Sequence, residues 1–305
     1  MMSALPLTTA SESHSIVGHD RLRPATSNVA ALWTLYTLTL RQHLHGKRWM
    51  VMVALFLLPA SIAILSRSTG RTAPSLILEF FLAFMFIPLA LLPLIALLYA
   101  SGMIRDEQEE QTITYLLVRP IPKWAMYCMK LLATLTTAVV LTALLTALTY
   151  AAIYVGAGAP AGEAVVRCAK AVSVHSLAVV AYCALFGLVS ILTNRTLVVG
   201  IIYTAIVEGV FAILPFGIRF ATVIYYTRLI AYRMLDFNVT TFRGTKENFA
   251  ADGWQLDVDR DPQLLAQPST TTCLLVLLLA SLVFTVIAAW LCSRREFHVK
   301  VPEGD

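Results

Sequence analysis

Apolar residues along this chain gather into six long runs, which charged and polar residues separate. Each run holds 18 to 26 residues, and about 20 apolar residues suffice for a helix to cross the roughly 30 Å hydrocarbon core of a bilayer. The pattern therefore predicts an all-α integral membrane protein with six transmembrane helices. We place these helices at Trp49–Ser66, Leu76–Ser101, Leu131–Val155, Ala171–Leu192, Leu197–Ile218 and Thr271–Cys292.

The chain before the first span divides into two parts. Residues 1–28 are rich in Ser, Thr and His and lack the apolar run of a cleaved signal peptide, so we expect a disordered N-terminal tail. In residues 29–48, aromatic and leucine side chains recur at steps of three or four, which predicts an amphipathic helix in the membrane interface. The recurring positions are Trp33, Tyr36, Leu40 and Leu44.

A long outer loop, residues 219–270, follows the fifth run. Its first part, from Phe220 to Leu235, has an apolar and a polar face at helical spacing, so we expect an amphipathic helix on the outer surface. Three alternating aspartates before Pro262 are spaced as in a calcium loop, but Pro262 stands where that loop needs Gly. We therefore predict no metal site. Residues 293–305 form a cytoplasmic tail after the six-span domain of residues 49–292.

Two spans carry residues that interrupt a uniform apolar helix. Pro88 and Pro93 in the second span remove backbone donors, which predicts a kink that is either a functional hinge or a passive bend. The third span has small or hydroxyl residues at every fourth position, including Thr142 and Thr146. Such a stripe favours close helix packing. Alternatively, it lines a translocation path or faces a second protomer.

Glu208 is the acidic residue that the predicted spans place deepest, at the middle of the fifth span. A charged acid at the bilayer centre costs about 2.5–3.5 kcal/mol, so it should face protein or water. Gly200 and Thr204 lie on the same helical stripe and suit close helix contact. Three roles are open: a protonated acid bonded to a neighbouring helix, which we favour, a counter-charge for a cationic cargo, and a relay in a moving interface.

Composition and charge support the membrane assignment. Hydrophobic residues make up 58% of the chain and the mean hydropathy is +0.74, whereas soluble domains are about 45–50% apolar. Thirteen Lys and Arg residues gather on one set of short flanks, which places both termini in the cytoplasm and the protein in the inner (plasma) membrane. The net charge of +5 then needs no nucleic acid partner. The opposite short loops hold only Arg67, Arg71, Arg167 and Lys170.

The sequence shows no catalytic centre. The five cysteines include no CxxC pair, and a disulfide between Cys168 and Cys273 is open because both are expected on the outer side. No P-loop motif occurs, so this chain is not expected to bind ATP. His175 lacks the nucleophile elbow of a hydrolase near it, so an intramembrane enzyme is disfavoured.

A charged stretch, residues 102–123, lies between the second and third spans, and we call it the coupling stretch. Glu107 and Glu110 fall on one side of a helix, and Ile113, Leu116 and Leu117 fall on another, because residues three and four apart share a face. Two prolines end the pattern. The stretch therefore predicts an amphipathic helix at the membrane surface that offers acidic side chains to a partner.

The coupling stretch resembles the cytoplasmic signature of permease subunits of type-2 ABC exporters. In that family the stretch follows the second span and docks on a separate ATPase subunit. One departure is Gln111, because the family usually has Gly there. The residues that carry the resemblance or its implied coupling role are Arg105, Glu107, Glu109, Glu110, Thr112, Ile113, Leu116, Leu117, Arg119, Pro120, Ile121, Lys123 and Lys130.

The resemblance implies that this chain is the membrane permease of an ATP-driven exporter. Its partners would be a cytoplasmic ABC ATPase, a second permease copy and the lipid bilayer. ATP and magnesium would bind to the ATPase, and this chain would hold no cofactor and no catalytic residue. Closure of the ATPase pair would push on the coupling stretch and shift the spans between inward and outward states. The alternative is an ATP-driven complex that transmits force to envelope proteins without transporting a solute.

Overall fold

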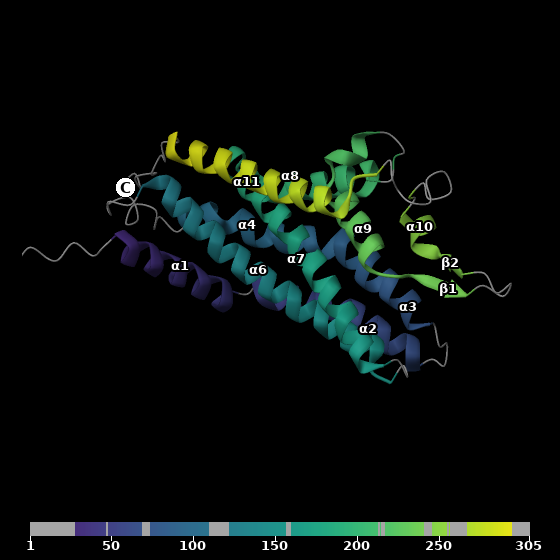
Figure 1. The fold of residues 1–305 in the computed structure, drawn as a ribbon. Coiled ribbons are helices and arrows are strands. Elements are labelled where there is room, and N and C mark those ends of the chain that lie inside the picture. Colours follow the sequence, from purple (N-terminus) through teal and green to yellow (C-terminus); the bar gives the residue numbers. More distant parts are fainter. Residues whose placement is uncertain are drawn as a thin grey trace, which may run out of the picture.

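A computed structural model describes residues 28–294, except for residues 47, 69–73, 110–121, 157–159, 213, 215–216, 241–245, 255 and 257–266. The molecule is an elongated bundle of helices with a smaller unit at one end (Figure 1). Helix α1 (Asn28–His45) and the C-terminal end of α11 (Thr270–Arg294) lie at the opposite end. The chain is thus an all-α membrane protein in its main body.

Among the described residues, five helical segments are long and apolar enough to cross a membrane, and they coincide with five of the six predicted spans. Helices α6 and α7 are 32 residues long and begin 8 and 10 residues before the predicted spans. They extend because Lys130 and Arg167 find partners within the protein, as described below, so these charges do not end the helices. The segments are α2 (Arg48–Ser68), the continuous run of α3 (Ser75–Leu78), η1 (Glu79–Leu91) and α4 (Leu92–Glu109), then α6 (Lys123–Tyr154), α7 (Ala161–Leu192) and α11.

The fifth predicted span is shorter than expected. α8 (Thr196–Tyr203) and η2 (Thr204–Phe211) form one helical segment of 16 residues. At 1.5 Å per residue it spans about 24 Å, which is less than the roughly 30 Å of the hydrocarbon core. The segment ends at Phe211, so the predicted end at Ile218 is wrong, and Ile218 belongs to a separate 3-10 helix, η3 (Gly217–Ala221). Glu208 lies in the last turn of this segment and not at its middle.

The second span is not a uniform α-helix. Its outer part, η1, is a π-helix that contains Pro88, and α-helical geometry resumes at Leu92, directly before Pro93. In a π-helix each amide bonds to the carbonyl five residues earlier, and such segments often mark functional sites. The amide of Leu92 bonds in this way to the carbonyl of Ile87. Both predicted hinge residues thus lie at an irregularity of the helix.

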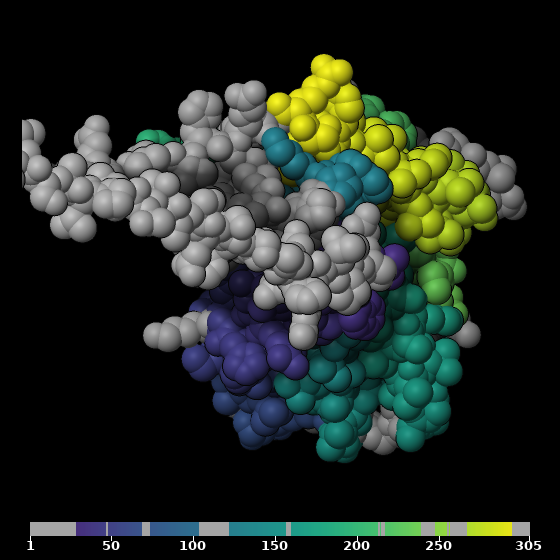
Figure 2. Space-filling model, turned by 90° about the vertical axis from the view of Figure 1, so that its left-hand side faces the viewer, coloured from purple at the N-terminus to yellow at the C-terminus, as the bar shows by residue number. Residues whose placement is uncertain are grey.

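Helix α1 coincides with the amphipathic helix predicted for residues 29–48. Leu35 and His43 are buried where α1 packs on α6, whereas Trp33 is exposed and stacks on Tyr36 at a ring-centroid distance of 5.3 Å. Figure 2 views the bundle from this end and shows α1 in purple against the teal α6, with α11 in yellow on the other side. The exposed aromatic pair is suited to headgroup depth in a membrane.

We call the unit at the far end of the bundle the cap, and the sequence pattern predicted it least well. Its antiparallel strand pair lies in the second part of the outer loop, for which no structure was predicted from the sequence. Its first helix occupies the predicted amphipathic segment, but the prediction of an exposed polar face is wrong, because Tyr225 and Arg228 are buried. Helices η1, α7, α10 and α11 pack around this first helix of the cap. The cap consists of α9 (Val223–Met234), β1 (Asn238–Thr240), β2 (Lys246–Asn248) and α10 (Phe249–Trp254).

An aromatic core joins the cap to the bundle. Phe80 and Phe84 of η1 contact Phe237 and Trp254 at ring-centroid distances of 5.2 to 6.2 Å. Gly253 permits this packing, because a Cβ atom there would meet the Phe80 ring at 2.6 Å. Helix α7 is central and contacts α4, α6, α9 and α11. By contrast, α2 and α11 expose most of their apolar side chains, as helices facing lipid do.

Candidate functional site

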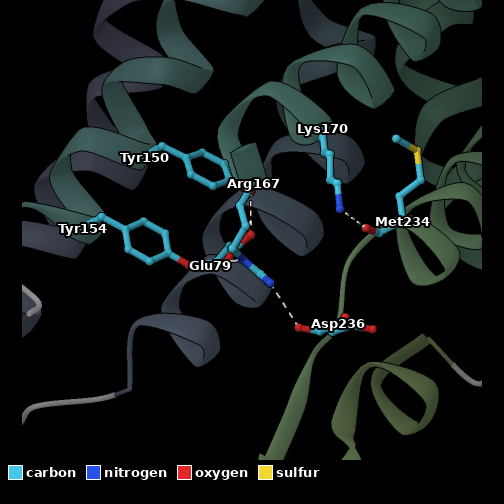
Figure 3. Close-up of polar contacts among 7 residues, drawn as sticks. All are labelled: Glu79, Tyr150, Tyr154, Arg167, Lys170, Met234 and Asp236. Atoms are coloured by element: carbon cyan, nitrogen blue, oxygen red, sulfur yellow. Dashed lines mark hydrogen bonds and ion pairs between the residues drawn. The ribbon is translucent and has the colours of Figure 1, made fainter. Parts of the chain in front are cut away.

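Glu79 lies at the centre of a buried polar cluster at the cap end of the bundle (Figure 3). It is the first residue of η1 and is fully buried. The Tyr150 hydroxyl donates to Oε1 at 2.7 Å, and the Tyr154 hydroxyl donates to Oε2. The Nε atom of Arg167 binds the same Oε2 at 2.8 Å. Because the tyrosines lie one turn apart on α6 and Arg167 lies on α7, the cluster holds three spans together.

Arg167 and Lys170 connect this cluster to the chain between α9 and β1. The Nη1 atom of Arg167 donates to the carbonyl of Asp236 at 3.2 Å, and the guanidinium lies 5.3 Å from the Phe237 ring centroid. The Nζ atom of Lys170 donates to the carbonyl of Met234 at 2.8 Å. Figure 3 shows both side chains reaching from α7 to this connection. Arg167 therefore links Glu79 of η1 to the cap.

The Glu79–Arg167 pair persists in the interior because neither charge is isolated. Removing each ion from water costs several kcal/mol, which only good geometry and further hydrogen bonds offset. The two tyrosines and the Asp236 carbonyl supply those bonds. Among the described residues, no three His, Cys, Asp or Glu side chains gather as they would around a metal ion. The hydrogen bonds and the ion pair of the cluster thus hold η1, α6 and α7 together.

The sequence prediction missed this cluster. Glu79 lies inside the predicted second span, so the inference that Glu208 is the one deep acid was wrong. Arg167 and Lys170 entered that prediction only as loop charges. The available signal was the opposite charge of Glu79 and Arg167 at the predicted outer ends of two spans, because an acid inside a span needs a partner.

Glu208 forms a second buried polar site where η2 meets the cap. Its Oε1 accepts hydrogen bonds from the Tyr203 hydroxyl at 2.8 Å and from the Val223 amide at 3.0 Å. Its Oε2 accepts one from the Ile224 amide at 2.9 Å. These are the first two amides of α9, so Glu208 caps a helix N-terminus, where the helix dipole favours negative charge. Three hydrogen-bond donors surround the carboxyl, and they fix its position between its own helical segment and the cap.

Arg228 on α9 adds to this electrostatic environment. Burial lowers the pKa of its guanidinium, and interaction with Tyr182 and Glu208 raises that pKa. Arginine stays charged in proteins, so Arg228 brings a positive charge to the surroundings of Glu208. Of the three roles that the sequence left open, the hydrogen bonds support the structural one: Glu208 joins the fifth helical segment to the cap.

Most of the predicted coupling residues lie outside the described part of the chain. Helix α4 continues to Glu109, so the coupling stretch begins as a direct extension of the second span. The side chains of residues 104–109 and all of residues 110–121 are not described, and their contacts with a partner stay predictions. They include Arg105, Glu107, Glu109, Glu110, Thr112, Leu116, Leu117, Arg119 and Pro120.

Two of the predicted coupling residues, Lys123 and Lys130, belong to the described part of the chain and lie in different positions on α6. Lys130 is buried at 2% exposure, and its Nζ donates to the carbonyl of Met103 at 3.0 Å. Its ammonium group is thus used inside the protein, and the predicted coupling role of Lys130 stays a prediction. Lys123 is the first residue of α6. Lys130 thus fixes the helix that leaves the coupling stretch beside the helix that enters it.

The hydroxyl stripe of the third span is buried inside the chain's own bundle. Thr142 and Thr146 are fully buried, and the Thr146 hydroxyl lies 3.2 Å from Nδ1 of His175 on α7. This location is that of a helix-packing surface. The five cysteines all lie within the described residues and form no disulfide with one another, so Cys168 and Cys273 are not joined.

The family model described as ABC-2 family transporter protein matches residues 44–212, which is more than half of the 305 residues. The chain belongs to the ABC-2 transporter family. The comparison with curated proteins gives no match. The matched residues include both buried sites and the coupling stretch of this ABC-2 protein. They end one residue beyond η2, so the cap and α11 follow the matched part.

Membership in the ABC-2 family makes this chain a multi-pass membrane component of an ABC transporter. Such a component is expected to be non-catalytic and to work with a separate ATPase. The two buried carboxylates then have a common feature. Glu79 and Glu208 both attach a membrane helix to the first cap helix or to the chain that follows it, so both link this ABC-2 protein's spans to its cap.

Glu208 substitutions in this ABC-2 protein should weaken the junction with the cap in graded steps. Glu208→Gln keeps one acceptor oxygen but places an amide donor against a backbone amide, so we expect a loss of about 1 kcal/mol in the free energy of unfolding. Glu208→Leu removes all three bonds and should cost about 3 kcal/mol. Reversible unfolding in mixed micelles measures both changes.

The matched control for these variants is Glu163→Gln, because Glu163 is an exposed acid on α7. It should change the free energy of unfolding by less than about 0.5 kcal/mol. A Glu208→Leu protein as stable as the native chain would show that the carboxylate does not hold the cap helix.

Proposed function

We propose that this chain is the permease of an ATP-driven exporter and that the run from Ser75 to Glu109 conveys movement from a cytoplasmic ATPase to the cap. The observation that supports the proposal is the continuity of this run. The run contains Glu79 and its ion pair near its first residue, and it extends without a break into the coupling stretch. Its 35 residues span about 50 Å at helical rise, which is more than the thickness of the hydrocarbon core.

In the proposed mechanism, ATP binding closes a pair of ATPase subunits and pushes on the coupling stretch. Lys130 keeps α4 and α6 together at this end, so the two helices move as a unit. At the other end, Glu79 moves relative to Arg167, and the cap follows through the Asp236 carbonyl. The packed interface then has two arrangements, inward and outward, because tightly packed helices shift in discrete steps. ATP and Mg²⁺ stay on the ATPase.

We place both termini and the coupling stretch in the cytoplasm, with six spans. The Lys and Arg distribution supports this orientation. In Figure 1, α1 and the end of α11 lie at one end of the bundle and the cap lies at the other. The short α8–η2 segment runs toward the cap and serves as the fifth crossing. A second permease copy, identical or related, completes the proposed complex.

Cysteine labelling tests this layout, on which the proposed function depends. Gln108→Cys in the coupling stretch and Asp252→Cys, at an exposed position of α10, are each introduced into a variant without the five native cysteines. A membrane-impermeant maleimide should label Gln108→Cys only from the cytoplasmic side and Asp252→Cys only from the outer side. Labelling of both cysteines from the same side would overturn the six-span layout. Labelling of Gln108→Cys from the outer side would place the coupling stretch on the side of the membrane away from the ATPase.

A second candidate function is the transmission of force to a protein outside the membrane without transport. The cap favours it, because the cap has its own aromatic core and an ion-paired attachment to the second span. ATP hydrolysis that is stimulated by an outer protein and moves no solute distinguishes this function from export.

A further inference from the structure

A groove on the surface of the bundle lies between the second span and the α8–η2 segment. Its volume is about 370 Å³, which is within the range of about 300–1,000 Å³ that is usual for ligand sites. Leu89 and Leu97 of the second span form one side, and Ile201, Ala205 and Gly209 form the other. Because Ile201 and Ala205 are exposed, the groove is open to the surroundings of the bundle.

Two glycines of the α8–η2 segment explain the shape of this groove. A Cβ atom at Gly200 would overlap the Leu97 side chain, so the segment and the second span touch there. A Cβ atom at Gly209 would meet only the carbonyl of Thr204, at 3.6 Å, and no atom of the second span within 4 Å. The groove therefore begins beside the Gly200 contact and stays open as far as Gly209.

The lining of the groove is apolar. Thr204 is the polar residue among those that line it, and its hydroxyl already donates to the carbonyl of Gly200 at 2.9 Å. Glu208 precedes Gly209 in the sequence, but its carboxyl points to Tyr203 and to the first amides of α9. An occupant of the groove is therefore hydrocarbon, because burial of a polar group without a hydrogen-bond partner is costly.

The size of the groove favours an extended chain over a helix. From Ile201 to Gly209 the segment rises about 12 Å. A helix 10–12 Å across would fill on the order of 1,000 Å³ over this length, well above the 370 Å³ of the groove. A lipid acyl chain is much narrower than a helix, so the groove suits it better than it suits a membrane helix of a second copy.

Arg195 lies at the start of the same segment and supplies a positive charge. It is the N-cap residue of α8 and is exposed, and its guanidinium has no hydrogen bond or ion pair with the described residues. Arg219, beyond the other end of the segment, instead lies over the rings of Phe220 and Tyr225. The charge that is available to a lipid phosphate is therefore at the end of the segment away from the cap.

The distance from Arg195 to the groove matches the dimensions of one lipid leaflet. Along the helix, Arg195 is about 9 Å from Ile201 and about 21 Å from Gly209. In each leaflet the headgroup layer is about 5–7 Å thick and the hydrocarbon about 15 Å. A phospholipid with its phosphate at Arg195 thus has an acyl chain at the depth of the groove.

We propose that the groove binds an acyl chain of an anionic phospholipid whose phosphate pairs with Arg195. The chain fills the space that Ala205 and Gly209 leave, and the guanidinium donates to the phosphate oxygens, as arginine commonly does. The lipid belongs to the leaflet at the end of the bundle away from the cap. This inference goes beyond the proposed export function and does not depend on it, because lipid binding here requires neither an ATPase nor a cargo.

Photolabelling of the native chain tests the proposal. The full chain is placed in vesicles of phosphatidylcholine and phosphatidylglycerol, with a trace of phosphatidylglycerol that carries a diazirine in the middle of one acyl chain. Illumination should attach the lipid mainly to two peptides, those that hold residues 89–97 and 201–209. A native chain labelled no more on these peptides than on the lipid-exposed helix α2 would overturn the proposal.

Two pairs of variants separate the groove and the charge. Ala205→Trp fills the groove and should lower labelling of residues 89–97 about 5-fold or more, whereas Ala54→Trp, at an exposed position of α2, should leave it within about 2-fold. Arg195→Gln should lower labelling of the groove about 5-fold. Its control is Arg41→Gln, because Arg41 is an exposed arginine of α1. Equal labelling in the two members of either pair would contradict the proposal.

Other occupants of the groove give different results. Diacylglycerol with the same diazirine chain but no phosphate should label the groove at least about 5-fold less than phosphatidylglycerol does, and equal labelling would show an apolar site without headgroup recognition. If a second copy covers the groove, Ala205→Cys in a variant without the native cysteines should form a disulfide-linked dimer upon oxidation. Such a dimer, or equal labelling by diacylglycerol, would overturn the proposed phospholipid site.

Discussion

Glu79→Ala should be among the most destabilising single substitutions in this chain, with a loss of about 3–5 kcal/mol in the free energy of unfolding. The reason is the charge left behind: Arg167 would stay buried without its partner, and two tyrosine hydroxyls would lose their acceptor. Arg167→Ala should cost a similar amount, because it isolates the Glu79 carboxylate. Reversible unfolding in mixed micelles gives both values.

A double variant distinguishes the loss of the ion pair from the loss of side-chain volume. Glu79→Leu with Arg167→Met removes both charges and keeps the volume filled, so it should cost less than either single variant to Ala. The control variant is Glu163→Ala, because Glu163 is an exposed acid on α7. It should change the free energy of unfolding by less than about 0.5 kcal/mol. If the double variant loses as much free energy of unfolding as the two single variants together, the ion pair is not the source of their destabilisation.

Loss of the Glu79–Arg167 pair should also affect the proposed transmission of movement to the cap. The double variant with Leu and Met should stay folded, yet it lacks the polar link from η1 through Arg167 to Asp236. We therefore expect it to lose coupling between ATP hydrolysis and movement of the cap. A fluorescent label on Asp252→Cys that still responds to ATP in this variant would show that the cluster holds the fold without conveying movement.

The hydrophobic pattern predicted the positions of the long helices well, because about 20 consecutive apolar residues have few structures available in a membrane. It failed where neighbouring elements decide the outcome. The start of α7 depends on Arg167, whose charge is compensated by Glu79 of another helix. The π-helix η1 contains Pro88 and packs against α7 and α9, and local spacing does not report these contacts.

The cap was difficult to predict for a related reason. Tyr225 and Arg228 appear polar on a helical wheel, but aromatic packing from η1 and α10 and the nearby Glu208 make their burial favourable. The strand pair from Asn238 to Asn248 is too short to give an alternating pattern. Glu208 itself was identified as important, but its partner was a helix N-terminus formed by later residues, and not a neighbouring span.

Reversal of two acids in the coupling stretch should separate this chain from its ATPase. Glu107→Lys with Glu110→Lys replaces two negative charges by positive ones at the predicted interface, and like charges across an interface cost several kcal/mol. A loss of about 3 kcal/mol corresponds to roughly 100-fold weaker binding. Because these residues lie between the second and third spans and outside the apolar runs, the variant should still insert into the membrane in normal amount.

A variant with the same change in net charge provides the control. Glu163→Lys with Asp252→Lys reverses two exposed acids at the cap end of the bundle. It should leave ATPase association within about 3-fold of the native value, since exposed charges far from an interface contribute little to binding. Equal losses in both variants would assign the effect to net charge and not to the coupling stretch.

The most direct test of the account is purification of the tagged chain from the membranes of its own source, followed by measurement of MgATP hydrolysis. The native chain should bring with it a subunit that carries a P-loop and hydrolyses ATP, and the chain with Glu107→Lys and Glu110→Lys should be recovered without that subunit. A native chain that purifies without ATPase, or a double variant that retains it in full, would contradict the proposed coupling.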